Sequence, residues 1–221
     1  MRFFFILTGS SLILFSCVTP QKVNRLVAKE YNNTLPKQDR KKNTGIIITS
    51  PLLPGSDVIS ATEKKTSHML PLLFYWQWDY INTCSLNPAI AINNFSTTLY
   101  TQTNRGLNKK LNGEKLELTV EQIPNVFAFV DKAHMIWVVY AFGWDKIFVQ
   151  PDAKDLIVSY KVSQNGNEIK SGKISIKNTE QNKGVRFFQS WKSAISEYLA
   201  LYNQDVTNMS KAFVTKLIEE L

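Results

Sequence analysis

Residues 155–167 read Asp-Leu-Ile-Val-Ser-Tyr-Lys-Val-Ser-Gln-Asn-Gly-Asn, a stretch that alternates apolar and polar side chains and ends in a turn signal. Successive side chains of a strand point to opposite faces. The alternation therefore predicts a strand whose inward face carries Leu156, Val158, Tyr160 and Val162. Asn165-Gly166 favours a type I′ hairpin turn, because both central residues of that turn need positive φ. The returning strand changes the parity of its apolar positions, which predicts a β-bulge near Ser171-Gly172.

A second segment, residues 115–121, shows the same alternation, with Leu116, Leu118 and Val120 as the apolar set. We therefore expect segments 115–121 and 155–163 to be strands of one antiparallel sheet. The other predicted strands are residues 46–48, 69–81, 126–131, 135–149 and the return strand over 169–176. Residues 52–66 carry Pro54-Gly55 and are predicted to form a loop.

Two longer segments have apolar residues at helical spacing. Asn87-Pro88 opens the first, because Asn caps helix N-termini and Pro is favoured at the first helical position, and Asn112-Gly113 closes it. The second runs over residues 185–221 and would be about 55 Å long as a single helix. It therefore either breaks near residues 203–205 or projects beyond the domain. Together these elements predict an α+β fold, an antiparallel sheet with helices packed on one face.

The N-terminal residues have the pattern of an export signal: Arg2 precedes an apolar run over 3–15, and a small residue precedes Cys17. The run is too short for a spanning helix, which needs about 20 apolar residues. Residues 14–17, Leu-Phe-Ser-Cys, resemble a bacterial lipobox. This resemblance implies that cleavage removes residues 1–16 and that Cys17 carries the lipid. The alternative is an ordinary secretory signal followed by a buried core cysteine.

The chain then divides into a signal peptide at 1–16, a lipidated tether at 17–43 with a short helix near residues 23–32, and a single α+β domain at 44–221. Mean hydropathy is −0.16, which excludes a multi-span membrane protein. If Cys17 is acylated, Cys84 has no disulfide partner, because the chain has only these two cysteines. Cys84 is then either a small buried side chain or a reactive thiol.

The signal, segment 155–160, the Asn-Gly hairpin and the closing segment 214–221 together resemble small envelope lipoproteins of Gram-negative bacteria. More loosely, the chain is similar to the auxiliary lipoproteins that accompany ABC-type lipid transport systems. The resemblance implies a non-catalytic accessory or binding component in the periplasm, with an envelope protein or a lipid as partner. Such signals carry a residue like Val18 after the cysteine when the lipoprotein proceeds to the outer membrane. No acidic cluster follows Cys17, which implies the periplasmic face.

The formal net charge of +8 is concentrated in basic clusters, and one strand carries a stripe of aromatic residues. The candidate ligand or partner surface consists of Trp76, Trp78, Arg105, Lys109 and Lys110. The alternatives are that the aromatic residues fill the core of a small sheet and that the basic residues form a solvated face. No nucleic-acid-binding motif is present, so membrane lipid or an envelope protein is the expected partner.

The sequence contains no motif for catalysis: no Gly-rich phosphate loop, no nucleophile elbow and no metal-ligand spacing. We therefore expect no enzyme activity, no cofactor and no metal. The alternative is a cell-envelope hydrolase that uses Asp131 and His134 as an orienting carboxylate and a base. The spacing Asp131-Lys132-Ala133-His134 is also that of a charged turn between strands.

Overall fold

The computed structural model describes residues 18–36, 45–53, 56–72, 74–103, 106–137 and 141–221. The helices are α1 (Pro20–Glu30), α2 (Pro88–Thr103), α3 (Leu107–Leu111) and α4 (Trp191–Glu220). The strands are β1 (Ile46–Thr49), β2 (Ser60–Leu72), β3 (Tyr75–Leu86), β4 (Lys115–Gln122), β5 (Val126–Trp137), β6 (Ala141–Pro151), β7 (Leu156–Gln164), β8 (Asn167–Ile176) and β9 (Lys183–Gly184).

The strands form two sheets, of order β1-β4-β7-β8 and β2-β3-β5-β6-β9. All strand pairs are antiparallel except β1 with β4. The predicted α+β class is confirmed, and so is the antiparallel pairing of the two alternating segments, now β4 and β7. Leu116, Leu118 and Val158 are fully buried, as the alternation predicted. The second sheet was not predicted as a separate unit.

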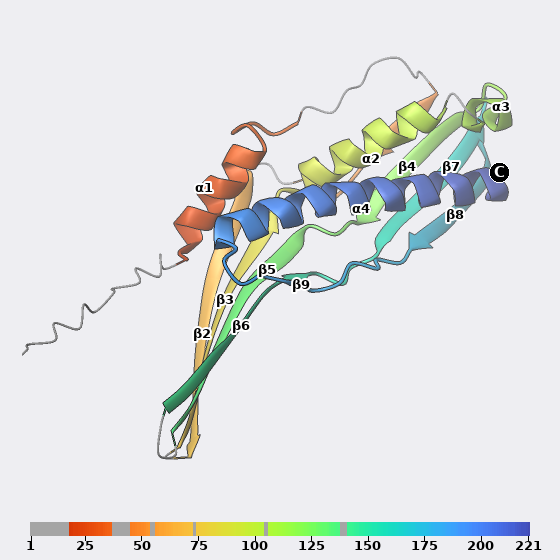
Figure 1. Ribbon diagram of the computed structural model, residues 1–221. Helices are drawn as coiled ribbons and strands as arrows, with labels where there is room; N and C mark the ends of the chain where they lie inside the picture. Colours follow the sequence, from red (N-terminus) through yellow and green to blue (C-terminus); the bar gives the residue numbers. More distant parts are fainter. Residues whose placement is uncertain (1–17, 37–44, 54–55, 73, 104–105, 138–140) are drawn as a thin grey trace, which may run out of the picture.

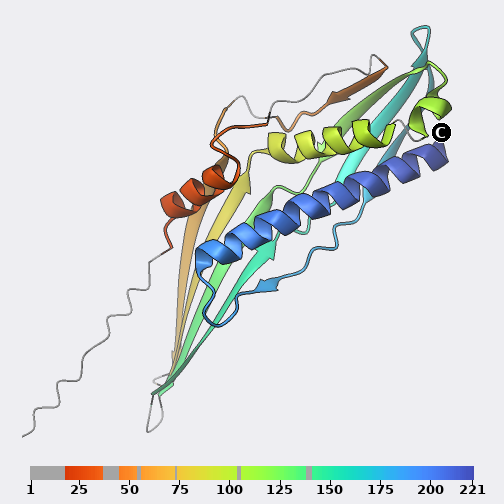
Figure 2. The same cartoon turned by 45° about the horizontal axis from the view of Figure 1, so that its top comes forward.

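Helix α4 neither breaks near residues 203–205 nor projects beyond the domain, so this prediction is wrong. Its 30 residues form one continuous helix, about 45 Å long. Figures 1 and 2 show that it runs along the same side of both sheets. Residues from Ala194 to Leu217 are buried along its length, because two sheets in succession offer a longer surface than one. Helix α2 packs beside it, and the rings of Phe95 and Phe213 lie 5.3 Å apart at that contact.

Helix α1 forms where the sequence predicted the tether's short helix. Thr19 caps it, and Lys22 donates its backbone N–H to the Thr19 hydroxyl oxygen. The helix is more than a spacer, because Val23 and Val27 are fully buried in the common core. Asn24 Oδ1 also accepts a hydrogen bond of 2.6 Å from the Thr62 hydroxyl on β2. The domain core therefore begins before residue 44.

The two long hairpins of the five-stranded sheet differ from the prediction. The expected loop over 52–66 and single strand over 69–81 are wrong: β2 starts at Ser60, and the chain turns between Leu72 and Tyr75. In the same way β5 runs to Trp137 and β6 starts at Ala141. Both turns lie in apolar sequence, and the start of β2 is polar on both faces. Apolar periodicity therefore places the strand centre where the structure has a turn.

The shorter turns follow their sequence signals. Asn165 and Gly166 have φ values of 51° and 87°, as a type I′ turn requires. The predicted bulge is present but earlier: Val162 pairs with Lys170 and Ser163 with Glu168, so Ile169 is the extra residue. Asn112, with φ 44°, ends α3 in the left-handed region.

Candidate functional site

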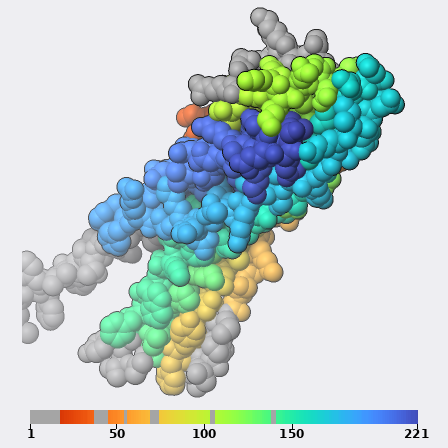
Figure 3. All heavy atoms as spheres, turned by 90° about the vertical axis from the view of Figure 1, so that its right-hand side faces the viewer, coloured from red at the N-terminus to blue at the C-terminus, as the bar shows by residue number. Residues whose placement is uncertain are grey.

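The far ends of four strands extend beyond every described helix. We call this part the blade: residues 66–72 of β2, 75–80 of β3, 131–137 of β5 and 141–147 of β6, which lie opposite one another in the sheet. Figures 1 and 3 show it projecting from the body of the molecule. No described side chain in the blade is buried. Both faces of the blade's tip are therefore open, although the sequence there is rich in aromatic residues.

One face of the blade, which we call the outer face, carries a stacked group of rings. The His134 ring lies 5.2 Å from the Trp144 ring at an interplanar angle of 14°. On its other side, the Tyr75 hydroxyl lies 2.8 Å from His134 Nδ1. The strand register explains this contact, because His134 is directly opposite Trp144 and Gln77, and Tyr75 is diagonal to it.

The opposite face, the helix-side face, carries a second aromatic group. Trp76 contacts Trp78 with ring centroids 6.3 Å apart and Trp137 with centroids 6.2 Å apart. The predicted surface residues Trp76 and Trp78 are half-buried. The largest exposed rings at this end were not predicted, and they are Phe74, Trp137, Phe142 and Trp144. The signal that could have found them is that two hairpin connections are apolar, over residues 69–74 and 137–142.

Charged residues follow the aromatic end toward the body of the molecule. On the outer face, Lys132 lies directly opposite both Lys146 and Asp79. Lys146 Nζ also lies 5.9 Å from the centre of the Phe148 ring. We call Lys65, Lys132 and Lys146 the lysine collar. The acidic residue Asp79 lies beside the collar on the same face. Gln77 Nε2 donates a hydrogen bond of 3.0 Å to Asp79 Oδ1.

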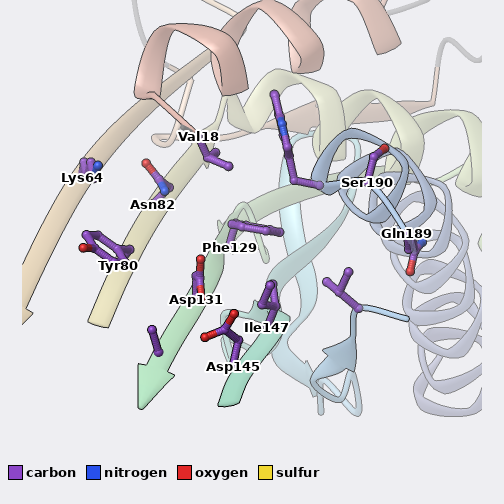
Figure 4. Close-up of a pocket in the computed structure, with 13 residues that line it drawn as sticks. Val18, Lys64, Tyr80, Asn82, Phe129, Asp131, Asp145, Ile147, Gln189 and Ser190 are labelled. Atoms are coloured by element: carbon purple, nitrogen blue, oxygen red, sulfur yellow. The ribbon is translucent and has the colours of Figure 1, made fainter. Parts of the chain in front are cut away.

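A pocket of about 510 Å³ lies where the helix-side face meets the segments that lead into α1 and α4. The strands contribute Lys64, Tyr80, Asn82, Phe129, Asp131, Ala133, Asp145 and Ile147. The other wall is formed by Val18, Val185, Gln189, Ser190 and Trp191. Figure 4 shows Asp131 on β5 and Asp145 on β6 on neighbouring strands of this wall.

Two polar atoms of the pocket have no partner among the described residues: Asn82 Oδ1 and Asp131 Oδ1. Burial raises the pKa of the Asp131 carboxyl, and the nearby charge of Asp145 raises this pKa further. No ion pair links either carboxylate to a base in the described part of the chain. The Lys64 ammonium instead lies 5.3 Å from the centre of the Tyr80 ring.

The structure separates several residues that the sequence had grouped. Asp131 lines the pocket, whereas His134 contacts rings on the outer face, so the two side chains point to opposite faces of the sheet. Lys109 and Lys110 are exposed on α3, at the far end of the molecule from the blade (Figure 1). Cys17 and Arg105 lie outside the described residues.

Cys84 is fully buried, and burial raises the pKa of its thiol. This favours the interpretation as a small core side chain over a reactive thiol. Within the described ranges, no cluster of three or more His, Cys, Asp or Glu side chains has the arrangement of a metal site. None of the described helices is both long and apolar enough to cross a membrane.

Comparison of the chain with protein-family models, with curated proteins and with solved structures finds no match.

Proposed function

We propose that this is a non-catalytic, lipid-anchored protein of the bacterial envelope, placed on the periplasmic face of the outer membrane, whose blade binds a lipid bilayer. The observation that carries the proposal is the exposed aromatic end of the blade. Phe74 and Phe142 are 57% and 63% exposed, and Trp137 and Trp144 about half exposed. An exposed apolar group of this size, rimmed by polar residues, marks an interaction surface.

The composition of the blade favours a bilayer over a protein groove. Trp and Tyr rings prefer the membrane–water interface, because one end of each ring is apolar and the other can form hydrogen bonds. The lysine collar suits anionic headgroups, each lysine contributing about 1 kcal/mol near such a surface. Trp137 and Lys132 are five residues apart on β5, which corresponds to about 17 Å along a strand. With the collar at the headgroups, the aromatic end would therefore enter the upper acyl chains.

The position of Val18 supports this orientation. Val18, the residue after Cys17, lines the pocket beside Asp131, where the blade begins. A lipid on Cys17 would thus leave the domain on the same side as the blade, so both would face one membrane. Because acyl chains alone already hold a lipoprotein firmly, the blade would fix the orientation of the domain.

The geometry gives no support to a hydrolase built on Asp131 and His134. A carboxylate that orients a base must contact it, and here the sheet lies between the two side chains. His134 Nδ1 is already in contact with the Tyr75 hydroxyl. The contacts of both residues are therefore those of a binding surface and a pocket wall, which supports the non-catalytic proposal.

The distribution of tryptophan provides the test, because four of the five tryptophans lie in the blade and only Trp191 lies outside it. The lipidated Trp191→Phe variant, reconstituted into vesicles with brominated acyl chains, should lose most of its fluorescence relative to unbrominated vesicles. A variant that keeps Trp191 alone, with the four blade tryptophans changed to Phe, is the matched control and should be quenched much less. Equal quenching of the two variants would contradict the proposal.

A further inference from the structure

The geometry points to the pocket between the helix-side face and the start of α4 as a binding site for a ligand that joins an apolar body to a primary ammonium group. This inference does not depend on bilayer binding by the blade, since it rests on Asn82, Asp131 and Asp145 and not on the exposed rings or the lysine collar. It follows from the acceptor oxygens and apolar side chains that line the pocket. Two of these oxygens have no hydrogen-bond donor among the described residues.

Asn82 provides the first hydrogen-bond acceptor for such a ligand. Its side chain is only 2% exposed, it lines the pocket, and its Oδ1 accepts no hydrogen bond from the described residues. A buried acceptor without a donor destabilises the folded protein, because it has lost its hydrogen bonds to water. An amide oxygen can only accept, so the missing group must bring an N–H or O–H donor.

The carboxylates of Asp131 and Asp145 supply the charge. Asp131 is diagonal to Asn82 across β3 and β5, and diagonal to Asp145 across β5 and β6, so it lies between the two. Asp131 Oδ1 is buried and also lacks a donor. An ammonium group carries three donors and one positive charge. Its three donors match one amide oxygen and two carboxylates in number, and its charge is opposite to theirs. Lys64 also lines the pocket, but its ammonium lies by the Tyr80 ring and forms no ion pair with either carboxylate among the described residues.

The remaining wall suits an organic ligand and argues against a bare metal ion. Phe129, Ile147, Val185 and Trp191 present apolar surface to the same space. The volume of about 510 Å³ lies within the usual range for small-molecule sites. Aromatic rings beside carboxylates are the surroundings in which organic ammonium groups bind. A bare metal ion would leave this apolar surface without contacts.

Three short probes of equal length test the inference: hexylammonium, hexanol and hexanoate. They are titrated calorimetrically into the full lipidated chain in phosphatidylcholine nanodiscs, and the signal of empty nanodiscs is subtracted. Hexylammonium should bind at least about tenfold tighter than hexanol, since hydrogen bonds between oppositely charged groups are stronger than those of a neutral hydroxyl. Hexanoate should not bind. Equal affinities for hexylammonium and hexanol, or no binding of any probe, would overturn the inference.

Variants locate the binding. Asp131→Asn and Asp145→Asn preserve the shape of the wall and should each lower the affinity for hexylammonium by about tenfold. The matched control is Asp57→Asn, because Asp57 is exposed and does not line the pocket. Ala133→Trp fills the pocket without changing its charge and should abolish binding. Circular dichroism confirms that each variant is folded. Unchanged affinity in the two wall variants or in Ala133→Trp would show that hexylammonium binds elsewhere.

The same titration distinguishes two sources of the ammonium group. If a lipid headgroup is the ligand, phosphatidylethanolamine added to the nanodiscs should compete and weaken the apparent affinity for hexylammonium. If the ligand is a free amine, this addition should leave the affinity unchanged. Either result identifies the source once selective binding has been measured.

Discussion

Tyr160 on β7 and Gly172 on β8 lie directly opposite each other, and the Tyr160 ring occupies the space that a side chain at position 172 would need. A Cβ on Gly172 would come within 2.7 Å of the ring. The ring is buried, and its hydroxyl donates to Glu220 Oε2 at 2.8 Å. The absence of a side chain at Gly172 therefore leaves room for the Tyr160 ring, whose hydroxyl links β7 to the end of α4.

Gly172→Ala should lower the free energy of unfolding by about 1–3 kcal/mol, because the added methyl group forces the Tyr160 ring away from Glu220. The measurement is chemical denaturation. Gly184→Ala is the control, since nothing lies within 4 Å of a Cβ at that position. Equal stability of the two variants would mean that the ring can move without loss.

The contact between Tyr75 and His134 gives a second prediction. Their hydrogen bond of 2.8 Å is only half-buried, so the coupling free energy in a double-mutant cycle of Tyr75→Phe and His134→Ala should be about 0.5–1.5 kcal/mol. Neither variant should reproduce the effect of deleting the gene, because we propose no catalytic role for His134. A folded, anchored His134→Ala variant that behaves like a gene deletion would contradict that role assignment.

Sequence reasoning succeeded where a segment has one buried face. β4 and β7 alternate because helices cover one side of their sheet, and the Asn165-Gly166 turn has its own backbone requirement. It failed at β2 and in the blade. At the tip of the blade both faces are open, and β2 is polar along most of its length although α1 packs beside its start. Burial therefore imposes no period of two there, and apolar residues are concentrated at the turns. The blade was missed as a site for the same reason: Trp76 and Trp78 were recognised, but Trp137 and Trp144 were assigned to strand interiors.

The pocket could not be read from the sequence either. Asn82, Asp131 and Asp145 are 63 residues apart at the extremes, and only the register of three strands brings them together. The sequence paired Asp131 with His134 because the two are close along the chain. An offset of three residues in a strand places side chains on opposite faces.

Glu180 predicts how stability depends on pH. Burial and the charge of Asp205 raise its pKa to about 7, although Tyr198 donates a hydrogen bond to Oε2. Between the unfolded value near 4.5 and the folded value, the native state binds more protons than the unfolded state. By linkage, the free energy of unfolding should therefore fall as pH rises from about 4.5 to about 7.

Glu180→Gln should remove this fall and make the protein more stable at pH 8 than the parent, because a neutral amide replaces a carboxylate that is charged there. The measurement is the urea midpoint at several pH values. Glu114→Gln is the control, since Glu114 lies between α3 and β4 and is not among the groups that shift the pKa of Glu180. If the parent and Glu180→Gln midpoints change with pH in parallel, Glu180 is not the group responsible.

The lipid anchor is tested at Cys17. We expect Cys17→Ser to accumulate as unprocessed precursor and to incorporate no labelled fatty acid, because the lipobox resemblance assigns the lipid to that sulfur. Cys84→Ser is the matched control: Cys84 is fully buried in the core, so the variant should still be labelled and processed even if its stability falls. Equal labelling of Cys17→Ser and the parent would refute the anchor. It would also remove the orientation argument for the blade, while the exposed rings of Trp137 and Trp144 would still require a partner.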